Sequence, residues 1–558
     1  MLKKSFWLIL GILALLIVAV GAYFWTAGLM GSMFEYRSPL KDNPPAPGEP
    51  FDYAQGAPLT HKVVFVLIDA LREDTSRNIS VMPFLNELRS QGAQATMHSR
   101  PPSFSNPAWT ALLTGAWPDI NDGQPLNPPD KSHVRTFTQD DIFAAADRIG
   151  QKTAVSGYSW FEQMLVKSGV DAGFYTPGED NAADREVVDA ALPWLTQDYQ
   201  LVLIHIDQVD YAGHHEGGPL DPRWDAAANR SDELLREIVT NLDPSQDTII
   251  VLSDHGQIDR GGHGGQDPLT LIEPFVMVGA GVKPGSYPDI QMVDVAPTVA
   301  VLLGANIPAS NQGHVLTNML NLSDVQLAAI HDAVAYQQIQ LEQIYIPAIG
   351  ERATKVLVEP GQDVVDTYQQ AMDVARSQRL FRERTWRGLA ALLLAAIPAT
   401  VVFLKRGRKI AWLLAGALLY VLLFNLRYAV LDGRTYSLSS LVSQADIILF
   451  CAITSAIALL IAWLLTMLGL KAFRLSARSA SETTLSFVLT TIYLLALPIL
   501  WSYTLNDAVP TWTLPDAPGM LYMFLGFISL IQSLMVAVIG LLLTGIATLT
   551  AWLVGKQT

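Results

Sequence analysis

The sequence predicts an α/β domain with a mostly parallel sheet flanked by helices, joined to an N-terminal membrane anchor and a C-terminal all-α transmembrane domain. Short β-branched apolar runs between residues 61 and 320 are typical of strands that are buried on both faces of a sheet. One apolar stretch of membrane-spanning length stands near the N-terminus, and further apolar stretches follow residue 387. These observations divide the chain into a globular part and membrane-spanning parts.

The first apolar stretch covers residues 6–30 and is long enough to cross the roughly 30 Å hydrocarbon core of a bilayer. A cleaved signal peptide, the alternative, would have a shorter apolar core followed by a cleavage site with small residues. We therefore expect an uncleaved signal-anchor helix over residues 1–32. Residues 33–60 are polar and rich in proline, which predicts a linker.

Three apolar runs of the globular part lead to side chains that can hold a metal ion. Run 63–68 is followed by Asp69, and run 201–204 is followed by Asp210 and His214. Run 248–252 is followed by Asp254 and His255, and His263 comes shortly after. In open α/β sheets ligands bind beyond the carboxyl ends of the strands, so these side chains are expected to meet there. Carboxylates mixed with neutral imidazoles suit zinc or a similar divalent ion.

A candidate nucleophile lies between the first and second of these runs. Pro107 is favoured in the first turn of a helix, which places Ser105 and Asn106 at a helix N-terminus. The free N–H groups and the positive dipole end of a helix suit a phosphate oxygen. A serine hydroxyl is a weak nucleophile that metal coordination can activate. We predict Ser105 as the nucleophile in preference to Ser103, and Thr110 lies too deep in the helix to reach outward.

Each of these residues taken alone has an ordinary structural explanation. An Asp at a strand end is most often a turn or helix-capping residue, and a single His is most often a surface or core residue. The combination, in this order and after successive strand-like runs, is much harder to explain in that way. His205, His215 and Glu216 have no place in the pattern, and for them we predict ordinary structural roles.

These motifs resemble the alkaline phosphatase superfamily, in its type I phosphodiesterase and nucleotide pyrophosphatase branch. The matching features are a strand that ends at Asp69, a Ser nucleophile with Pro107 two residues later and a helix ending Thr114-Gly115, the Asp-x-x-Gly-His motif of residues 210–214, the Ser-Asp-His-Gly motif of residues 253–256, and a last His at 263. The resemblance covers roughly residues 61–318. It implies an alkaline-phosphatase-like fold for residues 61–320.

The resemblance also implies a two-metal phosphoryl-transfer site. One divalent ion would be held by Asp69, Asp254, His255 and the Ser105 oxygen, and the other by Asp210, His214 and His263. Zinc is the expected metal and manganese the alternative. Two such ions clamp the attacking and leaving oxygens of an in-line displacement, which would pass through a phosphoseryl-type intermediate.

Two positions near the nucleophile differ from related enzymes. Several nucleotide pyrophosphatases have Asn where this chain has Ala108, so Asn106 is our candidate for binding the phosphate. Sulfatases have Arg where this chain has Trp109, which disfavours a sulfatase.

The C-terminal part is predicted to cross the membrane about five times. Its apolar spans cover residues 388–404, 410–426, 447–470, 484–503 and 519–553, and we take the last as one tilted helix with an extension rather than two passes. Positively charged loops face the cytoplasm, which places Lys3, Lys4, Lys556 and the clusters at 405–409 and 471–478 inside. The globular domain then lies outside the cytoplasm. Five arginines between residues 376 and 387 fall on that outer side, where contact with lipid phosphates would explain them.

The net charge and the cysteine content of the chain exclude two kinds of binding partner. The chain carries a formal net charge of −15, and the acidic excess precedes residue 387, so a nucleic-acid partner is not expected. The single cysteine, Cys451, lies within an apolar span, so no disulfide within the chain and no disulfide-linked partner are expected.

Residues 321–386 carry apolar residues at helical spacing and are predicted to be a helical juxtamembrane region before the membrane domain of residues 387–558. The combination of a phosphate-handling domain with a multi-span tail is similar to the ethanolamine phosphate transferases of glycolipid-anchor synthesis. This resemblance implies a multi-pass cell-membrane enzyme that acts on a phosphodiester, lipid-linked or near the membrane. Two alternatives remain open: a nucleotide pyrophosphatase or phosphomonoesterase, and a membrane scaffold or sensor with a vestigial metal site.

Overall fold

The computed structural model describes residues 2–51, 58–353, 355–404, 407–441, 444–471 and 477–557. Linker residues 52–57 and the basic residues Lys405, Arg406 and Arg474 therefore lie outside the described residues. The chain forms two compact units. The α/β unit comprises residues 34–380 and 511–514, and the helical unit comprises residues 1–33, 381–510 and 515–558.

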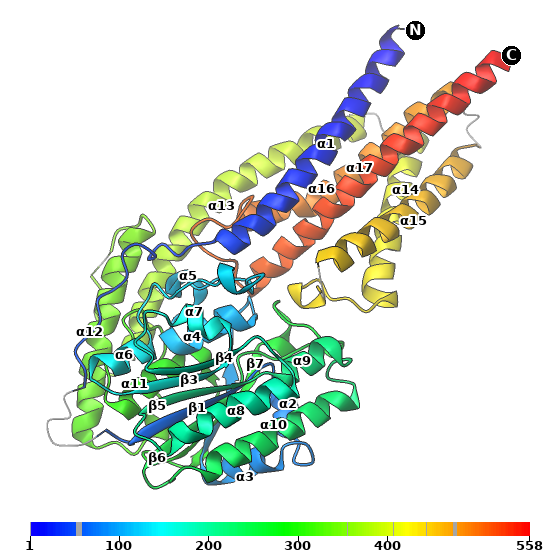
Figure 1. The fold of residues 1–558 in the computed structure, drawn as a ribbon. Helices are drawn as coiled ribbons and strands as arrows, with labels where there is room; N and C mark the ends of the chain where they lie inside the picture. The colour runs from blue at the N-terminus through cyan, green and yellow to red at the C-terminus, as the bar shows by residue number, and fades with distance from the viewer. Residues whose placement is uncertain are drawn as a thin grey trace. The chain divides into compact units, whose positions relative to one another are not determined.

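A nine-stranded sheet forms the centre of the α/β unit (Figure 1). Its strands are β1 (Lys62–Ile68), β2 (Ala93–His98), β3 (Thr153–Tyr158), β4 (Ala172–Thr176), β5 (Leu201–Ile206), β6 (Asp247–Leu252), β7 (Ile272–Gly279), β8 (Gly285–Ser286) and β9 (Ile290–Gln291). The strand order is β4-β3-β5-β1-β6-β7-β2-β8, and β9 pairs with β2. Strands β4, β3, β5, β1 and β6 are parallel, whereas β7 is antiparallel to both of its neighbours. The predicted fold class, an α/β domain with a mostly parallel sheet, is therefore confirmed.

Helices cover both faces of this sheet. They are α2 (Glu73–Ser76), α3 (Pro83–Gln91), α4 (Ser105–Thr114), α5 (Pro118–Asn121), α6 (Ile142–Arg148), α7 (Trp160–Met164), α8 (Asn181–Leu195), α9 (Gln208–His215), α10 (Pro222–Thr240), α11 (Val295–Leu303) and α12 (Asp324–Ala348). Side chains of β1 alternate between two apolar cores, because successive residues of a strand point to opposite faces. Val63, Phe65 and Leu67 pack in the core that includes α4, α6 and α11. The intervening residues of β1 pack in the core that includes α3, α8 and α10.

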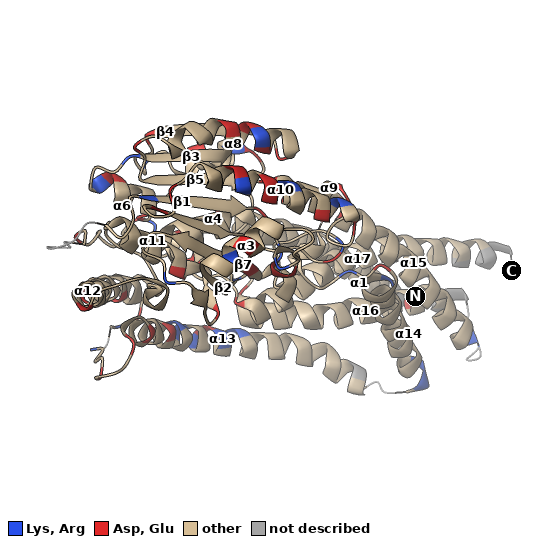
Figure 2. Ribbon diagram, turned by 90° about the horizontal axis from the view of Figure 1, so that it is seen from below, with Lys and Arg blue, Asp and Glu red and all other residues tan. Residues whose placement is uncertain are grey.

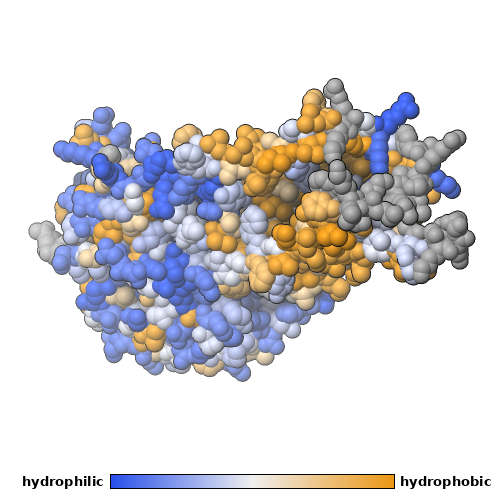
Figure 3. Space-filling view, turned by 90° about the horizontal axis from the view of Figure 1, so that it is seen from above, coloured by the Kyte–Doolittle hydropathy of each residue, from blue (hydrophilic) through white to orange (hydrophobic). Residues whose placement is uncertain are grey.

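The helical unit consists of long apolar helices. They are α1 (Leu2–Glu35), the C-terminal part of α13 (Val364–Leu404), α14 (Arg408–Asn425), α15 (Gln444–Lys471), α16 (Ala477–Asn506) and α17 (Ala517–Gln557). Five segments of the described residues are long and apolar enough to span a membrane: Leu8–Glu35, Arg408–Leu431, Ala445–Lys471, Ala480–Asn506 and Ala517–Thr550. The chain is thus a multi-pass membrane protein. Charged residues are frequent on the α/β unit and scarce along α14–α17, and apolar side chains dominate the visible surface of the helical unit (Figures 2 and 3).

Two predicted spans need comment. The predicted span 519–553 lies within one uninterrupted helix, α17. The predicted span 388–404 forms the C-terminal part of α13, a helix that begins in the α/β unit at Val364.

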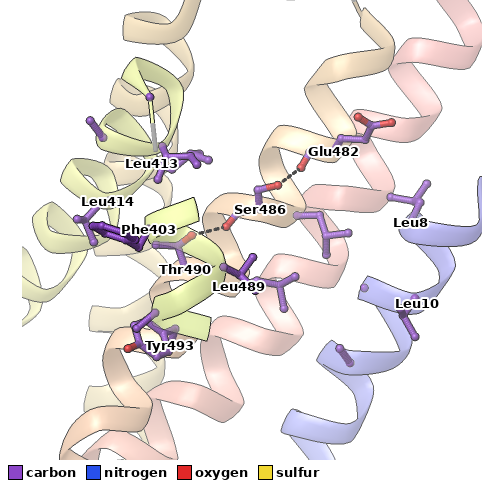
Figure 4. A pocket seen from close by; sticks show the side chains of 18 residues that line it. Leu8, Leu10, Phe403, Leu413, Leu414, Glu482, Ser486, Leu489, Thr490 and Tyr493 are labelled. Atoms are coloured by element: carbon purple, nitrogen blue, oxygen red, sulfur yellow. Dashed lines mark hydrogen bonds between the residues drawn. The ribbon is translucent and has the colours of Figure 1, made fainter. Parts of the chain in front are cut away.

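An apolar cavity of about 1070 Å³ lies within the helical unit, between α1, α13, α14 and α16 (Figure 4). Three hydroxyl groups in its wall form hydrogen bonds within the protein, and the wall also includes Glu482. Ser486 and Thr490 donate hydrogen bonds to carbonyl oxygens of their own helix, and Tyr493 Oη donates to the carbonyl of Ala395 in α13. The rest of the lining is mostly apolar and is suited to a hydrocarbon chain.

Three arginines near the start of the membrane domain contact other parts of the protein, and the contact with lipid phosphates expected from the sequence stays a prediction. In the α/β unit, Arg376 Nη2 donates to Thr513 Oγ1 at 2.7 Å, and the guanidinium of Arg379 lies 4.1 Å from the ring centre of Trp512. In the helical unit, Arg384 Nε donates to the carbonyl oxygen of Leu505 at 3.0 Å. The last turn of α16 supplies Leu505, and the segment between α16 and α17 supplies Trp512 and Thr513. The sequence spacing did not reveal these partners.

The first turns of α13 are held by a charged contact with His314. Its Nε2 lies 3.2 Å from a carboxylate oxygen of Asp363 and of Asp366. Hydrogen bonding to Asp294, together with these two carboxylates, raises the pKa of His314 to about 9.

This pKa predicts a pH-dependent stability. Protonated His314 stabilises the folded state fully below its unfolded pKa of about 6.5, and that contribution is lost as pH rises through about 9. We expect His314→Gln to lower the thermal midpoint of the full-length protein more at pH 6 than at pH 10. Thermal unfolding of both proteins in detergent measures this, and an equal difference at the two pH values would contradict it.

Candidate metal centre and nucleophile

The predicted metal ligands gather at the carboxyl ends of three adjacent strands. Strands β5, β1 and β6 are neighbours in the sheet and run parallel. Asp69 follows β1, and α9, which follows β5, carries Asp210 and His214. Asp254 and His255 follow β6. Parallel strands end at the same edge of a sheet, so these residues converge although they are far apart in sequence.

The first group surrounds the Nε2 atom of His255. This atom lies 3.2 Å from Ser105 Oγ, 3.4 Å from Asp69 Oδ1 and 3.5 Å from Asp254 Oδ2. The other ring nitrogen donates a hydrogen bond to the carbonyl oxygen of Gly256 at 3.1 Å. Because that bond uses the N–H group, the lone pair on Nε2 faces the group. Burial lowers the pKa of His255 to about 4, which keeps the imidazole neutral.

The second group contains Asp210, His214 and His263. Asp210 and His214 are one helical turn apart on α9, so both face the same side. The Nε2 atoms of His214 and His263 are 2.9 Å apart, and each lies 3.5 Å from a carboxylate oxygen of Asp210. His263 donates from Nδ1 to the carbonyl oxygen of Ser103 at 3.0 Å, which again leaves Nε2 available.

The two groups adjoin each other. The rings of His255 and His263 stack with centroids 3.9 Å apart and planes 12° apart. Asp69, Asp210 and His255 offer ligand atoms within 4.8 Å of one another. The structure thus brings together all the residues that the sequence analysis assigned to two metal ions.

The chemistry of these residues fits divalent cations. Burial, followed by the charge of Asp254, raises the pKa of Asp69 well above its usual value, and burial raises the pKa of Asp254 to about 6. Asp69 Oδ1 is buried and has no hydrogen-bond partner among the described residues. A buried carboxylate oxygen without a partner is costly, and a cation at this place would remove that cost.

Ser105 is better placed than Ser103 for nucleophilic attack. It is the first residue of α4, and its hydroxyl faces His255. The hydroxyl of Ser103 instead accepts from the backbone N–H of Gly264 and lies within hydrogen-bond distance of Gly265 O and Thr270 Oγ1, each at 3.0 Å. Ser103 therefore fixes the loop that carries His263.

Asn106 is buried next to the nucleophile. Its backbone N–H donates to Asn127 Oδ1 at 3.0 Å, and its side-chain amide lies 3.5 Å from the sulfur of Met164. Its role in phosphate binding stays a prediction.

Two residues that the sequence analysis left outside the site contact its carboxylates. His205 Nε2 lies 2.9 Å from Asp69 Oδ2, and Trp109 Nε1 donates to Asp254 Oδ2 at 2.8 Å. The prediction of an ordinary role for His205 missed this contact. The available signal was a His within the fully buried strand β5, because a buried polar side chain needs a partner. His215 and Glu216, at the end of α9, enter neither group.

Comparison with known proteins identifies the family. Residues 63–123 and 125–379, more than half of the chain, match the family described as type I phosphodiesterase / nucleotide pyrophosphatase. The chain belongs to this family, which confirms the resemblance seen in the sequence.

Two curated relatives are ethanolamine phosphate transferases by name. The chain is 28% identical over 284 residues to the human GPI ethanolamine phosphate transferase 2, catalytic subunit, covering 46% of this chain and 28% of that protein. It is 26% identical over 298 residues to GPI ethanolamine phosphate transferase 2 of Candida albicans, covering 49% and 33%. The chain thus spans about a third of the length of these relatives.

Among solved structures, human ectonucleotide pyrophosphatase / phosphodiesterase 5 aligns over 47% of this chain and 100% of its own, with 15% identity and a TM-score of 0.39.

Proposed function

We propose that this protein is a membrane-anchored, metal-dependent phosphodiesterase or phosphotransferase that uses Ser105 as its nucleophile. The observation that carries the proposal is the position of Ser105 Oγ, 3.2 Å from His255 Nε2 and beside the carboxylates of Asp69 and Asp254. The substrate is a phosphodiester that is lipid-linked or close to the membrane. Two divalent ions, zinc in preference to manganese, would be held by the two groups described above.

The placement of these side chains supports the following reaction. Ser105 Oγ forms a bond to phosphorus as the bond from phosphorus to the leaving alcohol breaks, which gives a phosphodiester or phosphoryl group on Ser105. An acceptor alcohol or a water molecule then attacks the same phosphorus and releases Ser105. When bound, the divalent ions supply stabilisation of negative charge on the reacting oxygens. Asn106, next to the nucleophile, is proposed to bind the phosphate.

The names of the relatives favour transfer of phosphoethanolamine over the alternatives. Both are ethanolamine phosphate transferases by name, and this chain joins a domain of its family to several apolar helices. A nucleotide pyrophosphatase or phosphomonoesterase is the second candidate, supported by the description of the family. Incubating membranes that contain the protein with nucleotide, phospholipid and glycolipid phosphodiesters distinguishes them. Exclusive turnover of nucleotides would overturn the lipid assignment.

A scaffold or sensor with a vestigial site is disfavoured by the side chains themselves. All seven proposed ligand positions carry residues that can bind a metal ion, and backbone carbonyls orient the rings of His255 and His263. Purified protein should therefore contain metal in stoichiometric amount. Absence of bound metal after purification without chelators would support the vestigial alternative.

We also propose that the N-terminus is cytoplasmic and that the α/β unit lies outside the cytoplasm, at the cell membrane. Residues 511–514, between α16 and α17, belong to the α/β unit, which supports placing this loop on the same side as that unit. The basic clusters at 405–409 and 471–478 then face the cytoplasm.

Cysteine labelling tests this orientation. A cysteine at Thr511 should react with an impermeant thiol reagent added to intact cells, and one at Lys409 should react only after the cells are permeabilised. The native Cys451 is buried, so the unsubstituted protein serves as the blank. The reverse labelling pattern would invert the proposed topology.

A further inference from the structure

The two carboxylates of the first group are contacted by side chains that are not proposed metal ligands. His205 Nε2 lies 2.9 Å from Asp69 Oδ2, and Trp109 Nε1 donates to Asp254 Oδ2 at 2.8 Å. Both carboxylates are buried, and neither forms an ion pair with a Lys or Arg of the described residues. A neutral N–H donor fixes the direction of a carboxylate without neutralising it, so the negative charge is left for a cation.

The carboxylate of Asp69 is held through only one of its two oxygens. Oδ2 is in contact with His205, whereas Oδ1 lies 3.4 Å from His255 Nε2 and has no hydrogen-bond partner among the described residues. A hydrogen bond to one oxygen prevents the carboxylate from turning about its last bond. The contact with His205 therefore keeps Oδ1 directed at the first group, where a divalent ion would need it.

The surroundings of His205 determine which of its ring nitrogens carries the proton. Nδ1 is buried and has no hydrogen-bond partner in the part of the chain that the structure describes. A proton on Nδ1 would leave a buried N–H without an acceptor, which is unfavourable. An ionised carboxylate only accepts hydrogen bonds, so the proton is on Nε2, which donates to Asp69. The imidazole is therefore a neutral donor, since a second proton would again stand on Nδ1.

Packing fixes the ring of His205. Its centroid lies 4.8 Å from that of Trp109 and 5.5 Å from that of Phe161, and the rings of Trp109 and Phe161 stack with centroids 4.3 Å apart. Gly157, on the neighbouring strand β3, also adjoins His205, because a Cβ atom at Gly157 would stand 2.6 Å from the Cβ of His205. A contact that short would force His205 to move, so the absence of a side chain at 157 leaves the space that His205 occupies.

Asp254 is held by more donors than Asp69. Its Oδ1 accepts from the backbone N–H groups of Ala70 at 3.1 Å and of His255 at 3.0 Å, and its Oδ2 accepts from Trp109. Asp254 would keep the two backbone donors if the indole N–H were lost. The carboxylate of Asp69 has only the donor from His205 among the described residues, so its direction depends on that single contact.

We propose that His205 is a positioning residue for the first divalent ion and that Trp109 assists it at Asp254. His205 holds Oδ2 of Asp69, keeps Oδ1 directed at the place of the ion, and so raises the affinity of the first group for metal. Neither His205 nor Trp109 is a proposed ligand, and each acts through the carboxylate that it holds. This inference rests on the proposed function, because it concerns an ion that is assigned there.

Zinc binding to the purified full-length protein tests this role. The protein is freed of metal with a chelator and titrated with zinc in competition with a chromophoric chelator. His205→Phe keeps a ring but removes the donor, so the affinity for one of the two ions should fall about 10- to 100-fold while the other stays unchanged. His205→Gln carries an amide N–H at the same number of bonds from Cβ and should regain most of the lost affinity. A purely structural role of the ring predicts the opposite order, with Phe better than Gln.

Two further variants change the position or the number of donors. Gly157→Ala removes no polar group, but its methyl group displaces His205, so the affinity for the same ion should fall. Trp109→Phe should lower that affinity only a few-fold, because Asp254 keeps its two backbone donors. If His205→Phe does not yield folded protein, His205→Gln and Gly157→Ala still decide the question, since the first keeps the donor in place and the second displaces it.

His98→Phe is the matched control. His98 also ends a strand and has its Nε2 2.8 Å from a carboxylate, that of Asp289, which is not a proposed ligand. Its loss should leave both zinc affinities unchanged. Wild-type affinities for both ions in His205→Phe or in Gly157→Ala, or a weaker first ion in His205→Gln than in His205→Phe, would overturn the positioning role and leave the proposed function standing. A wild-type protein that binds no zinc would overturn the proposed function and the positioning role with it.

Discussion

Replacing Ser105 with Ala should reduce turnover at least about 1000-fold, because the variant has no oxygen with which to attack phosphorus. Folding should be unaffected, since Ser105 makes no helix-capping hydrogen bond and Ala is compatible with the first turn of α4. Most of the metal content should remain, because the six other proposed ligands are intact. Activity assays combined with metal analysis of the purified variant measure both effects.

Two further substitutions make this experiment specific. Ser105→Thr keeps a hydroxyl at the same position and should retain measurable turnover. Ser103→Ala removes the hydroxyl that bonds to the backbone of Gly264, so it should lower stability by about 1 kcal/mol and leave turnover largely intact. If Ser105→Ala kept more than about a few per cent of activity and Ser103→Ala lost it, the nucleophile would be Ser103.

The strands and the helix at Ser105 could be predicted because local chemistry determines them. Strand β1 is buried along its whole length, so its sequence is a continuous apolar run rather than an alternating one. Helix α4 begins at Ser105 because Pro107 fits its first turn, and it ends where Gly115 adopts the left-handed conformation with φ 69°. These signals lie within a few residues of the feature that they specify.

Contacts between distant segments could not be predicted in this way. His205 reaches Asp69 because β5 pairs with β1 in a register that sets His205 opposite Leu67, and a sequence alone does not give that register. The sequence predicts an ordinary core position for Trp109. Only the crossing of α4 over the sheet brings its indole N–H to Asp254. The contact of Arg376 with Thr513 could not be predicted either, because Thr513 follows it by more than a hundred residues.

His263 could be predicted only in part from the sequence. Its identity as a ligand candidate came from the motif, but its position depends on the glycines around it. Gly264 has a φ of 103°, and a Cβ atom there would stand 2.1 Å from the ring of Phe104, so only glycine lets this loop close over the start of α4. The loop then brings His263 Nε2 to within 2.9 Å of His214.

Replacing His263 with Ala should remove one metal ion per chain and lower activity by orders of magnitude. The second group would keep only Asp210 and His214, and two ligands hold a divalent ion far more weakly than three. The first group shares no proposed ligand with it, so its ion should stay. Metal analysis at neutral pH, where free imidazole is mostly deprotonated, gives the count for the wild type and the variant.

His215→Ala is the matched control for this experiment. His215 is the next residue after His214 on α9, but it is exposed and enters neither group, so its loss should change neither the metal count nor turnover. A lower count in His263→Ala with an unchanged count in His215→Ala would assign the lost ion to the second group. Equal metal content in wild type and His263→Ala, with activity preserved, would remove His263 from the site. The proposed mechanism would then need a different second ligand set, because Asp210 and His214 alone do not complete one.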